Sequence, residues 1–345
     1  NPELFFQTKL YTGNDGTLAV TLDGSENMQP DWVWIKARNY AINHSIFDSV
    51  RGIKKELNSN ANTAEETEND MLTAFGTNGF TVGSAGGVNS SSRNYVAWNW
   101  KAGTSFSNDA SATSVGSIDS SGSINTTAGF SIITYTGTGS AATFAHGLSA
   151  VPKWILFKKT SGAQGWGVYH ASVGNTGALA INTTDSTDTT SNYFNNTSPT
   201  SSVVTVNTNN SVNNSGGTII AYCFAEKQGY SKFGSYIGNG NADSTFVFTG
   251  FKPAWLMIKP LGTASWRMWD NKREDYRGNV NQTTINANET GVEYDDSSVA
   301  IDFLSNGFKG RSSNSDISGS GTSYIYMAFA EAPFVNSNGV PSNAE

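Results

Sequence analysis

The sequence predicts an all-β protein built from three tandem antiparallel β-sandwich domains of jelly-roll or lectin type. A pattern roughly a hundred residues long occurs three times along the 345-residue chain. Within each copy, short β-branched and aromatic runs alternate with polar residues at a period of two. Asn-Gly, Gly-Asn and Ser-Gly pairs separate these runs, as turn residues do. A long apolar period typical of helices is missing, so we expect less than about a tenth of the residues to be helical.

The repeat has a fixed order of features. Each copy opens on a Tyr-x-Gly turn, at residues 11–13, 135–137 and 236–238. A proline, one variable residue and an apolar run from tryptophan to lysine follow, at residues 30–36, 152–158 and 253–259. Each copy closes on an aromatic-rich segment, at residues 97–100, 221–224 and 326–329.

The tryptophan-to-lysine run is apolar on both alternating faces, which predicts a central strand covered on both sides. Its proline stands at the strand start, where no ladder hydrogen bond is lost. We therefore expect Trp32, Trp154 and Trp255 to hold equivalent positions in three equivalent strands. Asn-Gly pairs at Gly79 and Gly307 predict tight turns at comparable places in the first and third repeats.

The repeats set the domain boundaries. We expect sandwich domains at residues 1–103, 129–227 and 228–335, and a polar tail at 336–345. Residues 104–128 are rich in serine, glycine and threonine, which indicates a linker, although two echoed pieces within it would suit a small extra ribbon. The second and third repeats are nearly contiguous, so we expect them to pack together and the first to be more independent.

Composition excludes several classes of partner. Charged residues make up 14% of the chain, aromatic residues 12%, and the net charge is −7. No basic stripe forms, so we expect no nucleic-acid partner. No apolar run approaches the roughly 20 residues of a membrane span, so we expect no membrane insertion. Cys223 is the single cysteine, which excludes intrachain disulfides, and its apolar surroundings indicate a small buried hydrophobe.

Signatures of chemistry are nearly absent, so we predict no enzyme, no catalytic residues, no metal and no cofactor. The glycine pairs at 137–139 and 238–240 lead towards strands, whereas a phosphate-binding loop leads into a helix. His44, His146 and His170 lie too far apart in sequence for a recognisable metal motif. Acidic residues do cluster at Glu293, Asp295, Asp296 and Asp302. A calcium site there is the alternative to a solvated acidic loop.

One set of aromatic residues suggests a binding surface. A short strand in each repeat, at residues 44–47, 166–169 and 266–269, ends on Phe47, Tyr169 or Trp269. Strand alternation places these three residues on the face opposite to Trp166 and Trp266, and we expect that face to point outward or to form a contact. Cross-strand packing, a sugar platform and a subunit contact are the open interpretations.

The next position in each repeat belongs to the same candidate site. It holds Asp48 in the first repeat, His170 in the second and Asp270 in the third, so the site tolerates a change of residue type. As ligand-binding or subunit-contact candidates we therefore name Phe47, Tyr169, Trp269, Asp48 and Asp270.

The chain resembles repeat-containing virion and tail-fibre proteins of marine and aquatic tailed bacteriophages. Residues 1–13, 30–36, 47–52 and 95–103 carry the resemblance, which is weaker in the second repeat. It implies a location in the virion and supplies no catalytic residues. We therefore predict a non-enzymatic structural or adhesive protein, virion-borne or extracellular, that contacts other virion proteins and host-surface glycans. A secreted or cell-surface carbohydrate-binding module is the alternative, followed by a tail-associated depolymerase.

The composition also bears on whether copies of the chain associate with one another. Low charge and many aromatic residues predict a homo-oligomer, a trimer if the protein is a fibre, because closed symmetry removes exposed sheet edges. The competing interpretation is that the three internal repeats already form a pseudo-threefold unit and one chain is sufficient.

Overall fold

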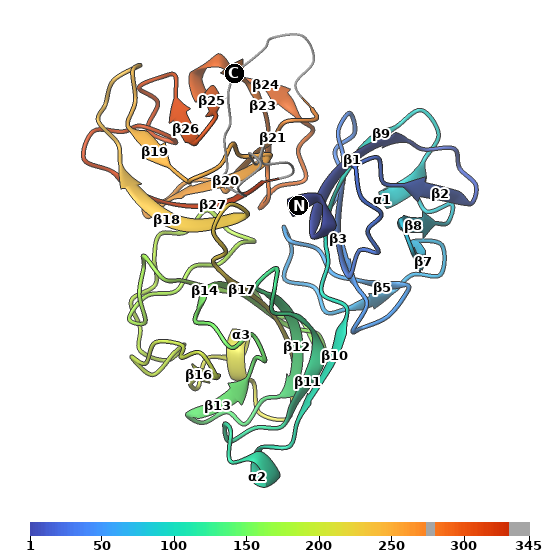
Figure 1. The fold of residues 1–345 in the computed structure, drawn as a ribbon, viewed down its shortest axis with the longest axis vertical. Helices are drawn as coiled ribbons and strands as arrows, with labels where there is room; N and C mark the ends of the chain where they lie inside the picture. The colour runs from blue at the N-terminus through green and yellow to red at the C-terminus, as the bar shows by residue number, and fades with distance from the viewer. Residues whose placement is uncertain (274–279, 331–345) are drawn as a thin grey trace.

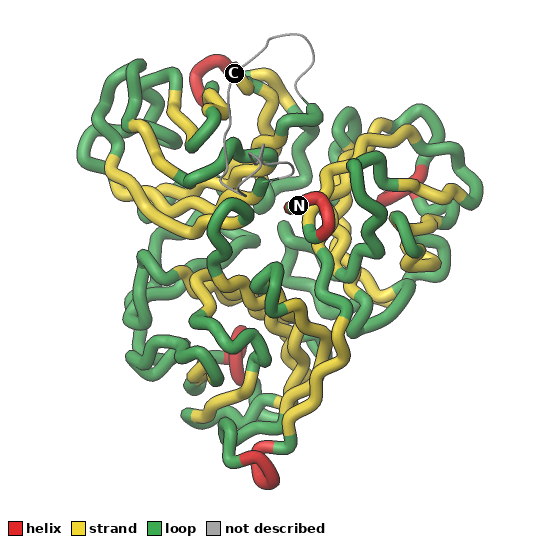
Figure 2. The backbone as a smooth tube through the Cα atoms, in the orientation of Figure 1, coloured by secondary structure: helices red, strands yellow, loops and turns green. Residues whose placement is uncertain are grey.

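A computed structural model describes residues 1–273 and 280–330. Strands make up 43% of the chain and helices 6%, and the paired strands of every sheet run antiparallel (Figures 1 and 2). The expected all-β fold with few helical residues is therefore confirmed. No helix in the described part of the chain is long and apolar enough to span a membrane.

The first repeat forms two main sheets. The larger has the order β1 (Phe6–Thr12), β9 (Asn94–Trp100), β3 (Trp32–Ala37) and β4 (Ser45–Asp48). The smaller has the order β2 (Leu18–Thr21), β8 (Gly79–Val82) and β7 (Leu72–Gly76). The short strands β5 (Lys55–Glu56) and β6 (Glu66–Thr67) pair with each other, and η1 (Pro2–Leu4) and α1 (Gly86–Asn89) are short helices.

The second repeat repeats this plan with a wider sheet. Its order is β10 (Thr104–Asn108), β11 (Ser120–Asn125), β12 (Phe130–Thr136), β17 (Thr218–Ala225), β14 (Pro152–Lys159) and β15 (Gly167–His170). The second sheet pairs β13 (Ala142–Ala145) with β16 (Val203–Val206). The helices α2 (Ala110–Thr113) and α3 (Asn210–Asn213) are short.

Residues 104–128 form a ribbon, which was the alternative to the linker that their composition indicated. They form β10, α2 and β11, and β11 pairs with β12 along its whole length. Along its edge β12 has backbone groups that hydrogen-bond to β11, and small side chains allow β11 to approach closely. Gly122 illustrates this, because a Cβ there would lie 1.8 Å from the carbonyl oxygen of Ile132.

The third repeat again has two sheets. The larger has the order β18 (Ser231–Ile237), β27 (Ser323–Phe329), β20 (Trp255–Pro260), β21 (Arg267–Asp270), β23 (Thr283–Asn286) and β24 (Tyr294–Asp295). The smaller has the order β19 (Phe246–Phe248), β26 (Gly307–Gly310), β25 (Ile301–Leu304) and β22 (Val280–Asn281), and η2 (Ser297–Val299) precedes β25.

The three tryptophan-to-lysine runs are equivalent strands, as predicted. Each of β3, β14 and β20 lies inside its large sheet, between the strand that closes the repeat and the short aromatic strand. Trp32 lies opposite Trp100, Trp154 opposite Phe224, and Trp255 opposite Phe329. The tight turns are confirmed too, since Gly79 begins β8 and Gly307 begins β26, each directly after its hairpin turn.

One face of each large sheet packs within its own repeat. In the first repeat a buried cluster joins Val33 and Phe47 of the large sheet to Phe80 of the small one. Corresponding clusters contain Ile155 and Phe144 in the second repeat, and Leu256 and Phe308 in the third.

The opposite faces of the three large sheets meet in one central core. This core contains Trp32, Trp154 and Trp255, and the described chain forms three lobes around it (Figure 1). At its centre the rings of Trp100, Phe224 and Phe329 form a triangle with centroid separations of 6.5, 5.6 and 5.5 Å. The expectation of a more independent first repeat is therefore wrong. Its large sheet buries an aromatic face that only the other two repeats can cover.

Candidate functional site

The predicted aromatic surface does not reach solvent. Phe47, Tyr169 and Trp269 are 0%, 3% and 0% exposed, and each belongs to the buried cluster inside its own repeat. Tyr169, for example, packs edge-on against Phe194 at 5.3 Å. The face assignment is therefore wrong. Alternation correctly placed these residues opposite Trp166 and Trp266, but both faces of each large sheet are buried. The face with Phe47, Tyr169 or Trp269 packs inside its own repeat, and the face with Trp166 and Trp266 is covered by the other repeats.

Asp48 and Asp270 instead connect neighbouring repeats. The Asp48 carboxylate accepts a hydrogen bond from the Tyr222 hydroxyl of the second repeat at 2.7 Å and pairs with Arg51 Nε at 2.5 Å. The Asp270 carboxylate accepts one from Trp98 Nε1 of the first repeat at 3.0 Å and pairs with Arg273 Nε at 2.5 Å. Both aspartates are fully buried, so these partners compensate the loss of hydration.

His170 completes the same ring with a different bond. The residue equivalent to Trp98 and Tyr222 in the third repeat is Met327, which has no hydrogen to donate. His170 Nε2 lies 3.3 Å from the main-chain oxygen of Tyr326, and its Nδ1 accepts from the Ser172 amide. Burial lowers the pKa of His170 to about 4, so the ring is neutral and donates to that carbonyl. The change from aspartate to histidine therefore follows the chemistry of the neighbouring repeat.

A second ring of contacts runs in the opposite direction. The first residue of each short aromatic strand segment reaches a main-chain oxygen of the adjacent repeat. His44 Nε2 lies 3.1 Å from Asn286 O, Trp166 Nε1 donates to Asn58 O at 2.9 Å, and Trp266 Nε1 donates to Ala180 O at 2.9 Å. Three equivalent backbone bonds join the same loops: Glu65 N to Thr160 O, Thr187 N to Leu261 O, and Glu293 N to Arg38 O.

The lysines that end the apolar runs are buried in these contacts. Lys36, Lys158 and Lys259 are each 0% exposed, and burial lowers the pKa of each ammonium group to about 8. The ammonium groups of Lys36 and Lys259 donate to main-chain oxygens at the end of their own strands, and that of Lys158 donates to Gln164 O in the loop after β14. Two also reach the adjacent repeat: Lys36 Nζ lies 3.3 Å from Thr290 O, and Lys158 Nζ lies 3.4 Å from Asn62 O.

The other residues considered for chemistry are either buried, as Cys223 is, or held in ion pairs, as Glu293 and Asp302 are. Burial raises the pKa of the Cys223 thiol to about 12, so it behaves as a small hydrophobe, as expected. The acidic residues weighed as a calcium site point to separate partners. Glu293 pairs with Arg38 at 2.8 Å, and Asp302 pairs with Arg311 at 3.3 Å. Among the residues that the structure describes, no three histidine, cysteine or acidic side chains gather closely enough to hold a metal ion.

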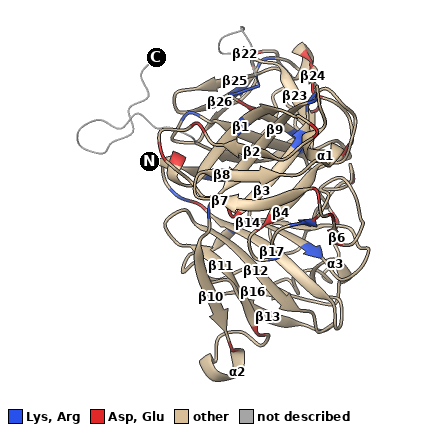
Figure 3. Cartoon of the chain, turned by 90° about the vertical axis from the view of Figure 1, so that its right-hand side faces the viewer, with Lys and Arg blue, Asp and Glu red and all other residues tan. Residues whose placement is uncertain are grey.

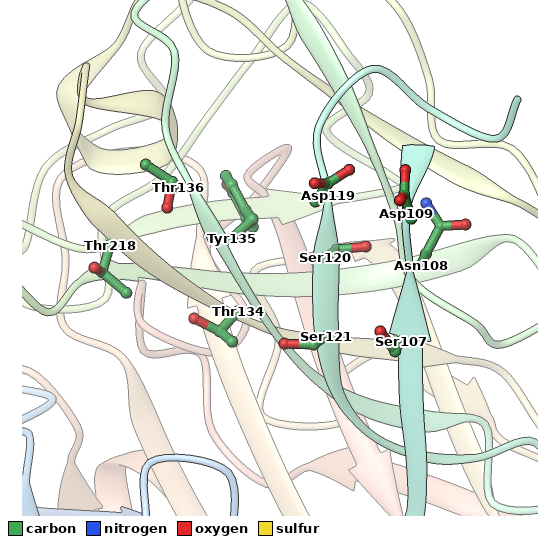
Figure 4. Close-up of a pocket in the computed structure, with 10 residues that line it drawn as sticks. All are labelled: Ser107, Asn108, Asp109, Asp119, Ser120, Ser121, Thr134, Tyr135, Thr136 and Thr218. Carbon is green, nitrogen blue, oxygen red and sulfur yellow. The ribbon is translucent and has the colours of Figure 1, made fainter. Parts of the chain in front are cut away.

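The surface offers shallow polar grooves. One, of about 340 Å³, crosses β10, β11 and β12 and is lined by hydroxyl groups that include Ser107, Ser121 and Thr134 (Figure 4). Its carboxylates, Asp109 and Asp119, accept hydrogen bonds from backbone amides around α2. A second groove, of about 400 Å³, shares Thr134 and extends to Arg51 at the junction of the first two repeats. These groups suit hydrogen bonding to a neutral polar ligand. Figure 3 shows short basic and acidic segments of the ribbon separated by long uncharged stretches.

A group of exposed apolar residues was missed by sequence reasoning. Phe248 is 61% exposed, Ile237 62% and Phe246 44%, and all three belong to the third repeat. An alignment of the three repeats would have identified these three positions. Their equivalents are Thr21, Thr12 and Ala19 in the first repeat, and Ala145, Thr136 and Thr143 in the second.

Residues 1–333 match a family model described as a domain of unknown function (DUF7483). No curated protein and no solved structure gives a significant match to the chain. The matched segment spans all three repeats, so the unit that defines the family is the whole three-repeat assembly.

Proposed function

Because the chain belongs to this family, whose function is unknown, we propose its role from its own geometry: a non-enzymatic structural protein of a tailed-phage virion, part of a fibre or surface appendage. The observation that carries the proposal is the closed ring of buried contacts. Asp48, His170 and Asp270 would be the natural candidates for chemistry, yet their polar atoms bind neighbouring repeats and lie away from solvent. Side chains used in this way stabilise a rigid unit whose loops are free to vary.

The unit itself is, in this proposal, three β-sandwich domains in series. In support, each repeat has a large and a small antiparallel sheet whose facing residues share one buried cluster. Strands of two sheets joined by such a cluster are the defining feature of a sandwich. The central core then acts as an interface between domains, and the three domains take the positions that three subunits take in a trimer.

The virion location rests on the phage resemblance and on a composition low in charge and rich in serine, threonine, asparagine and glycine. Localising the chain on purified particles by cryo-electron microscopy tests it. The expected result is density for a three-lobed unit in an appendage. If the purified particles lack the chain, the virion proposal is wrong, whatever the protein binds.

A glycan-binding role is the second candidate, either as an adhesive function of the virion protein or as a secreted carbohydrate-binding module. The hydroxyl-lined groove over β10 to β12 favours it, because Ser107, Ser121 and Thr134 lie in register on one face and their hydroxyl groups make no hydrogen bond within the described residues. Binding to a glycan array, lost in a Ser121→Tyr variant that fills the groove, would support it. Release of reducing sugar from host polysaccharide would instead favour the depolymerase.

A further inference from the structure

The three repeats treat their sheet edges differently. In the second repeat, residues 104–128 cover both edges: β11 pairs with β12, and the Ser117 and Ile118 amides donate to Thr143 O of β13. In the third repeat the equivalent edge strands are β18 and β19. Within the described residues β18 forms a ladder only with β27, and β19 only with β26. Their outer edges therefore keep unpaired backbone groups that can accept another strand.

The first repeat also has open edges, but its side chains discourage pairing. The equivalent strands β1 and β2 present the small side chains of Thr12, Ala19 and Thr21 to solvent. Small side chains at a free edge leave little apolar surface for a second strand to bury. The third repeat has Ile237, Phe246 and Phe248 at the equivalent positions. Exposed apolar and aromatic residues beside an unpaired edge mark a site of interaction with another protein surface.

We propose that the outer edge of the third repeat, defined by Ile237, Phe246 and Phe248, is the contact between two copies of this chain. The proposal rests on the structural role proposed above and names a surface through which two copies of the chain meet. The two β19 strands pair antiparallel about a two-fold axis, so that the phenylalanines of one copy pack on those of the other. Because a two-fold contact uses the same patch on both copies, it closes as a dimer and does not continue as a filament.

The charges around the edge suit contact with a second copy. Phe246 lies opposite Lys309 on β26, and Lys309 pairs with the largely exposed Asp243 at 2.5 Å. Phe248 borders a groove of about 430 Å³ that also contains Lys232, which pairs with Glu226 at 2.6 Å. A patch that carries both signs beside an apolar centre suits a two-fold contact, in which lysine of one copy can meet aspartate of the other.

Sedimentation velocity of the purified chain, at about 1 to 100 μM, tests the proposal. The native chain should dimerise, and the variant I237T/F246A/F248T should raise the dissociation constant at least about tenfold. These replacements are the residues of the first repeat, whose edge strands fold with them, so the variant should keep the native circular dichroism spectrum. Ile53→Thr, which removes an exposed isoleucine of the first repeat, is the matched control and should leave the dimer intact.

A native chain that stays monomeric at about 100 μM would overturn the proposal, because even a dimer with a dissociation constant of that order would be substantially formed there. A dimer unaffected by the triple variant would overturn it as well. Binding to a glycan array that depends on Phe248 in a monomeric chain would overturn it too, because the edge would then be a sugar platform. None of these results bears on whether the chain is found on particles, so the virion proposal stands or falls separately.

Discussion

At the scale of single residues, buried ion pairs within a repeat support the hydrogen bonds that the same aspartates make to the neighbouring repeat. Arg51 and Asp48 are both almost completely buried, and the carboxylate also binds Tyr222 across the repeat boundary. Removing one member of such a pair leaves an uncompensated charge in the interior, which costs far more than losing an exposed pair. The ring of contacts therefore depends strongly on a few side chains.

We expect Asp48→Ala to lower the free energy of unfolding by about 3–5 kcal/mol, because Arg51 would remain buried without its partner. Asp23→Ala removes the exposed pair with Lys9 and should cost less than about 1 kcal/mol. Urea denaturation of the two variants provides the comparison. Similar losses in both variants would contradict a large contribution of the buried Asp48–Arg51 pair to stability.

At the scale of elements, the Asn-Gly hairpins fix the register of the small sheets. Gly79 has a φ of +121°, and a Cβ there would lie 2.0 Å from the carbonyl oxygen of Val20 on the neighbouring strand β2. Both the backbone conformation and the space therefore require glycine. The register matters because a slip by one residue would turn Phe80 out of the cluster that joins the two sheets of the first repeat.

Gly79→Ala should destabilise the protein by about 1–3 kcal/mol or more, since strain at a positive φ and a clash with Val20 act together. A Cβ at Gly291 would meet no atom within 4 Å, and the backbone there has no positive φ, so Gly291→Ala should be nearly neutral. Thermal unfolding followed by circular dichroism distinguishes the two. A neutral Gly79→Ala would show that the hairpin can shift without cost.

At the scale of the whole molecule, the central core makes the three repeats one cooperative unit. Trp100, Phe224 and Phe329 come from different repeats and contact one another at the centre. Unfolding one repeat would expose the aromatic faces of the other two, so the lobes should not unfold independently.

Calorimetry should therefore give a single unfolding transition for the native chain. Trp100→Ala should lower the free energy of unfolding by about 3–5 kcal/mol while keeping one transition. Trp100→Phe, which installs the residue type of the other two repeats, should cost much less. Three separate transitions would contradict a shared core.

The three buried lysines give the whole molecule an unusual pH dependence. Their pKa is about 8 in the folded chain, below the ordinary value of 10.5, because burial disfavours the charged form. Between these values the unfolded chain binds more protons than the folded one, so the free energy of unfolding should rise with pH. Unfolded tyrosines begin to ionise near pH 10 and oppose this rise.

Urea denaturation at intervals from pH 8 to about pH 9.5 should show this rise, and Lys158→Met should reduce it by about a third, since one of three groups no longer titrates. Stability that is flat or falls across this interval in the native chain would mean that the lysines are charged and adequately solvated in the folded state.

The sequence alone determined the repeat, the all-β class, the equivalent central strands and the Asn-Gly turns, because period, proline placement and turn residues are local properties of the chain. It did not determine which face of a strand meets solvent. Phe47 and Trp32 lie on opposite faces of the large sheet, as residues of an inner and an outer face would, yet both are buried. Only the tertiary structure decided this, because the second face of each large sheet is covered by repeats about a hundred residues away. The same reason accounts for Asp48, His170 and Asp270, whose partners lie in other repeats. The place of residues 104–128 was likewise decided by tertiary pairing, because β11 extends the large sheet by pairing with β12.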